Sequence, residues 1–243
     1  MVDRSFGDPS LAALYDALHP WGPGDDFCLE YVMAAESVLD VGCGTGRLLR
    51  TARAHRHPGR LTGLDPAAAM LVRARWGEPS VEWVLGDLRS QVWDREFDLV
   101  VMTGHAFQVL VGDEELKAAL HAVRAALGTC GRFVFETRNP SARAWEAWTP
   151  DRVREISDPD AGTVRMWREV QEPVLGDRVT FTETFLSPRW YRVSRSTLRF
   201  PDPDAVHRLL AEAGLTVIER YGDWGRGPCT PASPEIITVA APG

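Results

Sequence analysis

The sequence lacks any run of about 18 consecutive apolar residues, the length that a helix needs to cross a membrane. Its first ten residues, MVDRSFGDPS, contain two aspartates and no apolar core of the kind that a secretory signal carries. These absences argue against a helical membrane protein and against export. We therefore expect no membrane partner and a cytoplasmic location.

Cysteines are also few. The four of them, at positions 28, 43, 130 and 229, lie far apart and form no CxxC pair, so we predict neither a redox pair nor a metal site. Basic residues are outnumbered by acidic ones, 27 to 34, which gives a net charge of −7 at pH 7. Because an acidic chain repels phosphate backbones, nucleic acid is not an expected partner.

What the chain does contain, after two expected helices at 9–18 and 27–35, is an alternation of apolar runs and amphipathic segments. The apolar runs predict buried parallel strands at 37–41, 61–64, 81–85, 97–102 and 132–137. Helices are expected between them, at 47–54, from the Asp65-Pro66 pair, and at 113–127 with Asp113 as cap and Gly128 as terminator. This order predicts a parallel sheet covered on both faces.

The pattern changes after residue 140. Segments 163–170, 178–186 and 191–200 alternate polar and apolar residues, as antiparallel strands do. A helix at 204–213 and strands at 216–221 and 236–240 then resume the α/β order. The 243 residues suffice for a single α/β domain with an insertion.

The strongest local signal is the run DVGCGTG at 40–46, which directly follows a strand and directly precedes a helix. Glycines allow a sharp turn and a close approach to a ligand, and the free amides of the helix start suit an anionic or polar group. A dinucleotide loop requires G-x-G-x-x-G. The last glycine of that pattern would fall on Arg47 or on Leu49, so both registers fail.

The run VLDVGCGTGRLL resembles the first motif of the class I S-adenosylmethionine-dependent methyltransferases. Four further features follow in the order of that family: Asp65 at the end of the second strand, Gly86-Asp87-Leu88 after the third, FDLVVMTGH, and GRFVFE. The resemblance covers residues 36–139 well and the last two strands loosely. It implies an α/β fold with a doubly wound, seven-stranded Rossmann-like sheet and an antiparallel β segment inserted after strand 5.

The same resemblance implies one domain over residues 1–243 with four parts. Residues 1–35 would form a helical cover and 36–139 the cofactor-binding core. Residues 140–200 would form the inserted β segment, expected to act as a substrate lid, and 201–243 the last helix and strands.

S-adenosyl-L-methionine is the cofactor that the resemblance implies, with S-adenosyl-L-homocysteine as product. An acid at position 65 can accept from two ribose hydroxyls, and in the family an acid such as Asp87 accepts from the adenine amino group. Aromatic faces favour a sulfonium cation, although Tyr15 and Trp21 could equally be packing residues, and Met70 plain core. The expected cofactor-binding residues are Tyr15, Trp21, Asp40, Gly42, Cys43, Gly44, Asp65, Pro66, Met70, Asp87, Leu88 and Thr103.

His105 follows the fourth strand, where the cofactor methyl is expected, and histidine has a suitable intrinsic pKa for a general base. A structural histidine is the alternative. The expected substrate-binding residues are Gln108, Arg138, Trp148 and Tyr191. The aromatic residues of the insertion either line an apolar pocket, form the insertion's own core, or make a dimer face, so both a monomer and a homodimer are open.

Some methyl acceptors can be argued against. Family members that methylate base amino groups often carry (N/D/S)-P-P-(Y/F/W) after the fourth strand, and RNA cytosine-C5 enzymes need a cysteine nearby; this chain has Thr103-Gly104-His105-Ala106 there. Together with the acidic charge, this favours a small molecule and methyl transfer to its O, N or C nucleophile, with natural-product biosynthesis as one setting. The alternatives are a non-methylating step such as cyclisation, a non-catalytic cofactor-binding protein, and a macromolecular acceptor.

Overall fold

The computed structural model describes residues 2–243 and contains a seven-stranded sheet with the order β10-β11-β5-β4-β1-β2-β3. Strand β11 pairs antiparallel with both of its neighbours, and the other pairs of this sheet are parallel. The strands are β1 (Ser37–Val41), β2 (Arg60–Asp65), β3 (Glu82–Leu85), β4 (Phe97–Met102), β5 (Leu127–Arg138), β10 (Leu215–Tyr221) and β11 (Glu235–Pro242). The predicted doubly wound α/β class is confirmed.

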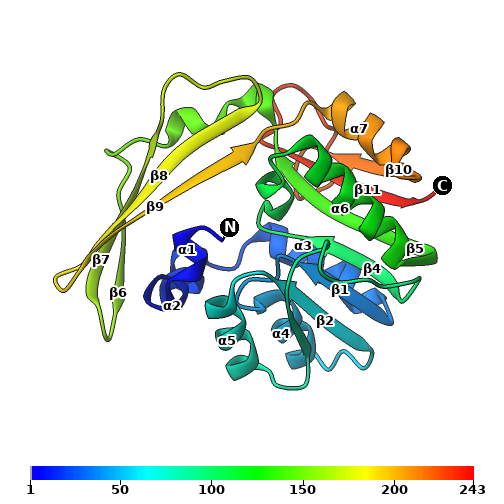
Figure 1. Ribbon diagram of the computed structural model, residues 1–243, viewed down its shortest axis with the longest axis horizontal. Coiled ribbons are helices and arrows are strands. Elements are labelled where there is room, and N and C mark those ends of the chain that lie inside the picture. The colour runs from blue at the N-terminus through cyan, green and yellow to red at the C-terminus, as the bar shows by residue number, and fades with distance from the viewer. Residues whose placement is uncertain (1) are drawn as a thin grey trace.

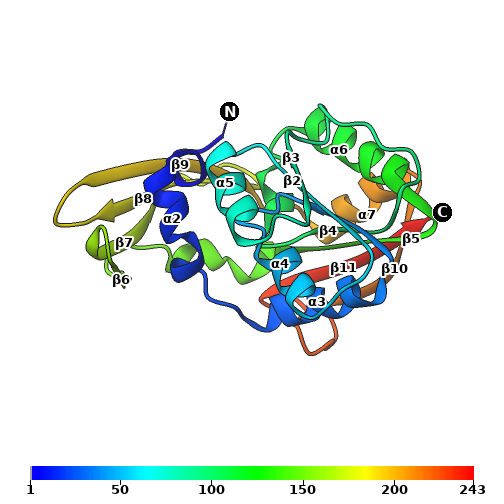
Figure 2. The same ribbon diagram turned by 90° about the horizontal axis from the view of Figure 1, so that it is seen from below.

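Apolar residues alternate along the central strands and fill two separate cores. Leu39 and Val100 face α6 (Asp113–Ala126) and α7 (Pro203–Glu212). Their neighbours in the chain, Val38 and Val101, face α3 (Pro23–Ala34) and α4 (Arg47–Ala54) instead. Figure 2 shows these two helix pairs on opposite faces of the sheet. Because both faces are buried, β1 and β4 need apolar side chains at nearly every position.

The insertion after β5 is a second, antiparallel sheet with the order β6-β7-β8-β9. Its strands are β6 (Arg154–Asp158), β7 (Gly162–Val170), β8 (Arg178–Leu186) and β9 (Tyr191–Arg199). Strand β6 was not predicted, because its sequence REISD is charged and mostly exposed at the sheet edge. Short 3-10 turns at Pro140–Ala142 and Ala144–Ala147 connect the two sheets.

The N-terminal helices lie between the two sheets (Figure 1). Short helix α1 (Arg4–Gly7) precedes α2 (Pro9–Leu18), which has two packing faces. Leu11, Leu14 and Leu18 pack on the inserted sheet. Ala12 and Tyr15 lie in a cluster with Ala67 and Met70, at the start of α5 (Ala68–Gly77). Helix α2 therefore joins the insertion to the core.

Several helix boundaries differ from expectation. Helix α3 begins four residues early, at Pro23, because Asp25 accepts from the Gly22 amide and caps a segment that was interpreted as turns. Helix α5 begins at Ala68, after Pro66. The Asp65 carboxylate accepts a hydrogen bond from the Ala67 amide at 2.7 Å, directly before the helix.

At α6, Asp113 lies in the first turn and Gly112 is the cap. The chain passes from α6 directly into β5, so Gly128 belongs to a strand. Within residues 2–243, no helix combines the length and the apolar character that a membrane span needs.

Candidate functional site

The glycine loop after β1 has a backbone that only glycine adopts without strain. Gly42, Gly44 and Gly46 have φ values of +76°, +56° and +74°. A Cβ at Gly46 would lie 2.2 Å from the Trp83 ring, whereas one at Gly44 would meet nothing closer than the Tyr15 ring at 3.9 Å. The loop therefore packs tightly against the Trp83 ring at Gly46 and has free space beside Gly44.

The open side of the loop borders a cavity of about 310 Å³, called the first cavity below. Its walls come from the loop, the ends of β2, β3 and β4, and the N-terminal helices. Among the residues predicted for the cofactor, the structure brings nine to this cavity: Tyr15, Gly42, Gly44, Asp65, Pro66, Met70, Asp87, Leu88 and Thr103.

The two aspartates of the first cavity differ in environment. Asp65 is buried, and its two carboxylate oxygens accept from the Gly44 amide at 2.8 Å and the Ala67 amide at 2.7 Å. Burial raises the pKa of Asp65, against the effect of these two bonds. Asp87 is more exposed, and hydrogen bonding to the Arg89 side chain at 2.6 Å lowers its pKa. Asp65 thus supports the loop while lining the cavity, and Asp87 lies at the rim.

A second cavity, of about 410 Å³, adjoins the first. Six residues line both cavities and form the boundary between them: Asp3, Phe6, Tyr15, Thr103, Gly104 and Val109. The remaining wall comes from α1 to α4, the end of β5, the inserted strands β6 to β9 and Trp224. Its charged side chains include Glu136, Arg138, Arg154, Arg168 and Glu183.

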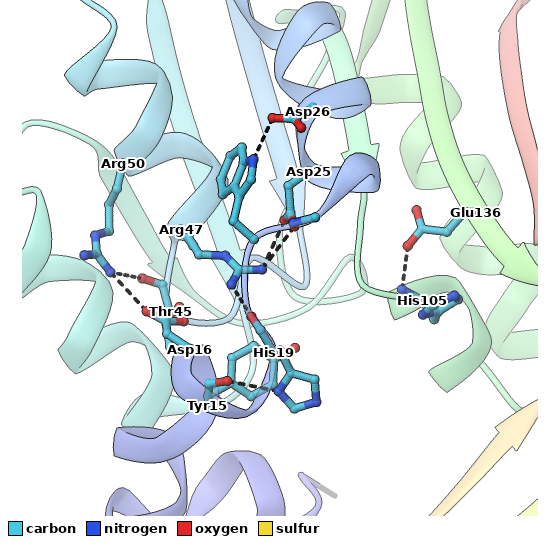
Figure 3. Close-up of polar contacts among 12 residues, drawn as sticks. Tyr15, Asp16, His19, Asp25, Asp26, Thr45, Arg47, Arg50, His105 and Glu136 are labelled. Atoms are coloured by element: carbon cyan, nitrogen blue, oxygen red, sulfur yellow. Dashed lines mark hydrogen bonds and ion pairs between the residues drawn. The ribbon is translucent and has the colours of Figure 1, made fainter. Parts of the chain in front are cut away.

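His105 lies on the wall of the second cavity in a left-handed conformation with φ +64°. Its amide donates to Glu136 at 2.7 Å, as Figure 3 shows, and its Nε2 contacts Glu235 at 3.0 Å. Burial raises the pKa of Glu136. No local pattern indicated Glu235, because it comes from β11, 130 residues away along the chain.

Comparison with known proteins shows which family the chain resembles. The profile of a family described as a methyltransferase domain matches residues 38–131. A dTDP-3-amino-3,6-dideoxy-alpha-D-glucopyranose N,N-dimethyltransferase of Streptomyces fradiae is 34% identical over 136 residues, 52% of either chain. A trans-aconitate 2-methyltransferase of Klebsiella pneumoniae is 30% identical over 161 residues, 63% of either chain. These matches span half to under two thirds of the relatives' length.

Solved structures share the fold over nearly the whole chain. The CcbJ methyltransferase of Streptomyces caelestis superposes with a TM-score of 0.76 at 21% identity, covering 94% of this chain and 98% of its own. CalS10, an amino pentose methyltransferase of Micromonospora echinaspora solved with its S-adenosylmethionine, superposes with a TM-score of 0.69 at 24% identity, covering 95% and 97%. Residues 38–131 thus match a methyltransferase family, and the whole chain shares the fold of solved S-adenosylmethionine-dependent methyltransferases. The family, and the cofactor that it uses, agree with the sequence prediction.

The first cavity of this methyltransferase fits the cofactor in one further respect. Asp40, on β1 directly below the loop, is fully buried, and its Oδ1 has no hydrogen-bond partner in the described chain. Burial first, and then the charges of Asp65 and Glu136, raise the pKa of Asp40 to about 8. A buried acid this close to the loop favours a cationic ligand above it, and the cofactor carries two cationic groups.

Three residues predicted for the cofactor lie outside the first cavity of the methyltransferase. Asp40 is one of them, because it lies beneath the loop. The Cys43 side chain packs against Leu71 and Ala74 of α5, so only its backbone belongs to the loop. Trp21 donates to Asp26 at 2.6 Å and lies under the Arg47 guanidinium, so it packs between α3 and α4.

Of the four residues predicted for the substrate, the structure brings only Arg138 to a cavity wall. Gln108 is fully buried and bonds Arg138. Trp148 packs against Phe181 with ring centroids 4.7 Å apart. Tyr191 is 58% exposed at the start of β9. The wall that the insertion provides therefore mixes three charged residues, Arg154, Arg168 and Glu183, with apolar ones that include Phe181 and Phe185.

Ion pairs that the sequence did not predict tie the N-terminal helices to α4 (Figure 3). Arg47, the first residue of α4, donates to the His19 carbonyl and pairs with Asp25 at 3.1 Å. Thr45 donates to Asp16 at 2.6 Å, and Arg50 pairs with the same aspartate at 3.6 Å. The helices that enclose both cavities are thus fastened to the glycine loop itself.

Proposed function

We propose that the protein transfers the methyl group of S-adenosylmethionine to an oxygen, nitrogen or carbon nucleophile of a small molecule. The observation that carries the proposal is the shared boundary of the two cavities, to which Tyr15, Thr103 and Gly104 contribute. A cofactor held in the first cavity would direct its reactive end toward that boundary. The sulfonium of the bound cofactor supplies an already activated methyl group.

The residues at the boundary leave room for transfer and exclude water. At Gly104 an added Cβ would meet nothing closer than the Tyr15 hydroxyl at 3.8 Å, so the passage has no side chain from this position. Tyr15 stacks on His19 with ring centroids 4.4 Å apart, and burial raises its pKa to about 12. Tyr15 therefore stays neutral and positions rather than exchanges protons. Alignment of a nucleophile in such a passage accounts for much of the rate enhancement.

His105 is the residue we assign as general base. When its Nε2 donates to Glu235, its Nδ1 is left as the proton acceptor, and the carboxylate favours the protonated ring that forms. The bond from its amide to Glu136 fixes the backbone in the left-handed conformation. This arrangement of an acceptor, a base and an orienting acid suits hydroxyl and ammonium nucleophiles, which must lose a proton.

A small acceptor is supported by the size and enclosure of the second cavity. Its volume of about 410 Å³ lies in the range of small-molecule sites, and α2 and the inserted sheet close it. The relatives named above act on an amino-sugar nucleotide and on trans-aconitate. Tailoring of a natural product or of a related metabolite is the setting that we propose.

The first test is calorimetric titration of the purified protein with S-adenosylmethionine, with NAD as the control ligand. We expect micromolar affinity for the first and no heat from the second. Incubation with S-adenosylmethionine and a panel of amino sugars, sugar nucleotides and polycarboxylates should then release one S-adenosylhomocysteine per methylated product. A folded sample that binds neither S-adenosylmethionine nor S-adenosylhomocysteine would refute the proposal, and product formed without S-adenosylhomocysteine would indicate a non-methylating reaction.

A further inference from the structure

Three carboxylates at or behind the wall of the second cavity already have partners. Glu183 pairs with Arg168 at 2.8 Å, and it also accepts from the Ser5 hydroxyl at 2.7 Å. Glu136 accepts the His105 amide, and Glu235, behind the wall, contacts the His105 ring. These three carboxylates therefore already form hydrogen bonds or ion pairs within the protein.

Arg138 has no such partner. Within residues 2–243, no carboxylate oxygen lies within 4.0 Å of its guanidinium. The only hydrogen bond of that group in the described chain runs from Nη1 to Gln108 Oε1 at 3.0 Å. A guanidinium has five N–H donors, so most of the donors of Arg138 are free at a cavity wall.

The guanidinium of Arg138 is held in place without being neutralised. It lies over the Trp148 ring at 5.4 Å from the centroid. Gln108 is itself fixed, because its amide donates to the Arg199 carbonyl at 2.7 Å. Burial, with a smaller contribution from Arg168, lowers the pKa of Arg138 to about 10 against the opposing charges of Glu235, Glu136 and Glu183, and the group stays charged at neutral pH. A charge that is enclosed, oriented and unpaired is costly unless a counter-ion joins it.

A second arginine on the wall of this cavity also has no acidic partner. Arg154 of β6 lines the same wall, and its Nη1 donates to the Leu18 carbonyl at 3.1 Å. It forms no ion pair within the described chain. The wall of the second cavity carries as many acids (Asp3, Asp25, Glu136 and Glu183) as arginines (Arg47, Arg138, Arg154 and Arg168), so the two arginines without an acidic partner, and not a net positive charge, would attract an anion.

We propose that the second cavity recognises an anionic acceptor and that Arg138 binds its carboxylate or phosphate group. This inference rests on the proposed function and specifies its substrate class. The planar fork of arginine matches both anions with two parallel hydrogen bonds. Trp148 and Gln108 act as positioning residues: they hold the fork in the orientation that leaves its donors toward the cavity.

The test measures anion binding to protein saturated with S-adenosylhomocysteine, by calorimetry at constant ionic strength. The probes are inorganic phosphate and succinate, with chloride as the baseline. We compare the wild type with Arg138→Gln, Arg138→Lys and the matched control Arg143→Gln. Arg143 also lies over a tryptophan, Trp145, but it pairs with Glu146 and lies outside both cavities.

We expect wild type and Arg143→Gln to bind at least one probe equally well. Arg138→Gln should weaken that binding at least about tenfold, a loss of roughly 1.4 kcal/mol, and Arg138→Lys should retain part of it. Binding of phosphate alone would identify a phosphorylated acceptor, and binding of succinate alone a carboxylate. The proposal is overturned if neither probe binds, if Arg138→Gln binds as wild type does, or if Arg143→Gln loses binding equally.

S-adenosylhomocysteine affinity and thermal melting, measured on each variant, show whether it is folded. They also separate the two proposals, because wild-type protein that fails to bind S-adenosylhomocysteine contradicts the proposed function, whereas failure of the anion probes alone contradicts only the acceptor class.

Discussion

The two cavities are built in different ways. The first is made largely from one stretch of chain, residues 41–119, in which each strand ends at a loop that reaches the cavity. The second gathers side chains from α1 to α4, the ends of β4 and β5, all four inserted strands and Trp224. Binding of the common cofactor is therefore a local property of the sequence. Choice of the acceptor depends on segments that only the tertiary structure brings together.

His105 provides the sharpest test of the proposed separation between cofactor binding and acceptor binding, because it lines the second cavity only. His105→Ala should cut turnover of an acceptor found by the panel about 100-fold or more if the ring is the general base. Affinity for S-adenosylmethionine should stay at the wild-type value. Steady-state kinetics and calorimetry on the same preparation measure both.

Two variants control that experiment. His105→Asn keeps a residue that tolerates positive φ but removes the base, so it separates catalysis from backbone strain at φ +64°. His55→Ala removes an exposed histidine at the end of α4 and should change nothing. Wild-type turnover in His105→Asn would remove His105 from the mechanism.

The next largest effect is expected for the affinity of S-adenosylmethionine, when residues of the first cavity are changed. Asp65→Ala removes the acceptor of two loop amides and of the expected ribose hydroxyls, so S-adenosylmethionine binding should weaken by roughly 1–3 kcal/mol. Asp87→Ala should cost less, because Asp87 lies at the more exposed rim and pairs with Arg89.

Asp98→Ala is the matched control for both substitutions. Asp98 also accepts two hydrogen bonds, both from Ser37, but at the opposite end of β4. Calorimetry gives the three affinities. Equal, wild-type affinity in the Asp65 and Asp87 variants would contradict the nucleoside assignment.

The same division explains how far the sequence could be interpreted. Strand β4 and helix α4 were predicted with their observed bounds, because a buried parallel strand and an amphipathic helix each show a local pattern. The glycine loop and Asp65 were predicted because backbone conformation limits which residues can occupy them. Position 46 shows this: a Cβ there would collide with Trp83.

The residues of the second cavity show no comparable local pattern in the sequence. Arg138 was predicted to bind substrate, but nothing in the chain indicates that Gln108 would orient it from 30 residues away or that Glu235 would contact His105. Among the aromatic residues of the insertion, Trp148 and Tyr191 were predicted to bind the substrate. Trp148 instead supports Arg138 and Arg168, because its ring packs beneath both guanidinium groups. Such relationships depend on side-chain directions, which composition does not specify.

Asp40, which lies beneath the glycine loop, gives the smallest and most specific prediction. Burial, with the charges of Asp65, Glu136 and Asp25, raises its pKa to about 8, so it stays protonated in the folded protein below that pH. In the unfolded chain it ionises near its ordinary value of 3.8. Unfolding therefore releases a proton between these two values, and stability falls as the pH rises through that window.

Asp40→Asn removes this titration, so its melting temperature should exceed that of the wild type by more at pH 8.5 than at pH 4.5. One kcal/mol corresponds to about 2–4 °C in a domain of this size, and we expect a gain of at least that amount at the higher pH. Asp98→Asn, at an exposed position, should show no pH-dependent difference. An equal difference at both pH values would mean that Asp40 is ionised in the folded protein. In that case the charge beneath the loop would be permanent, and a cationic ligand would not be needed to ionise it.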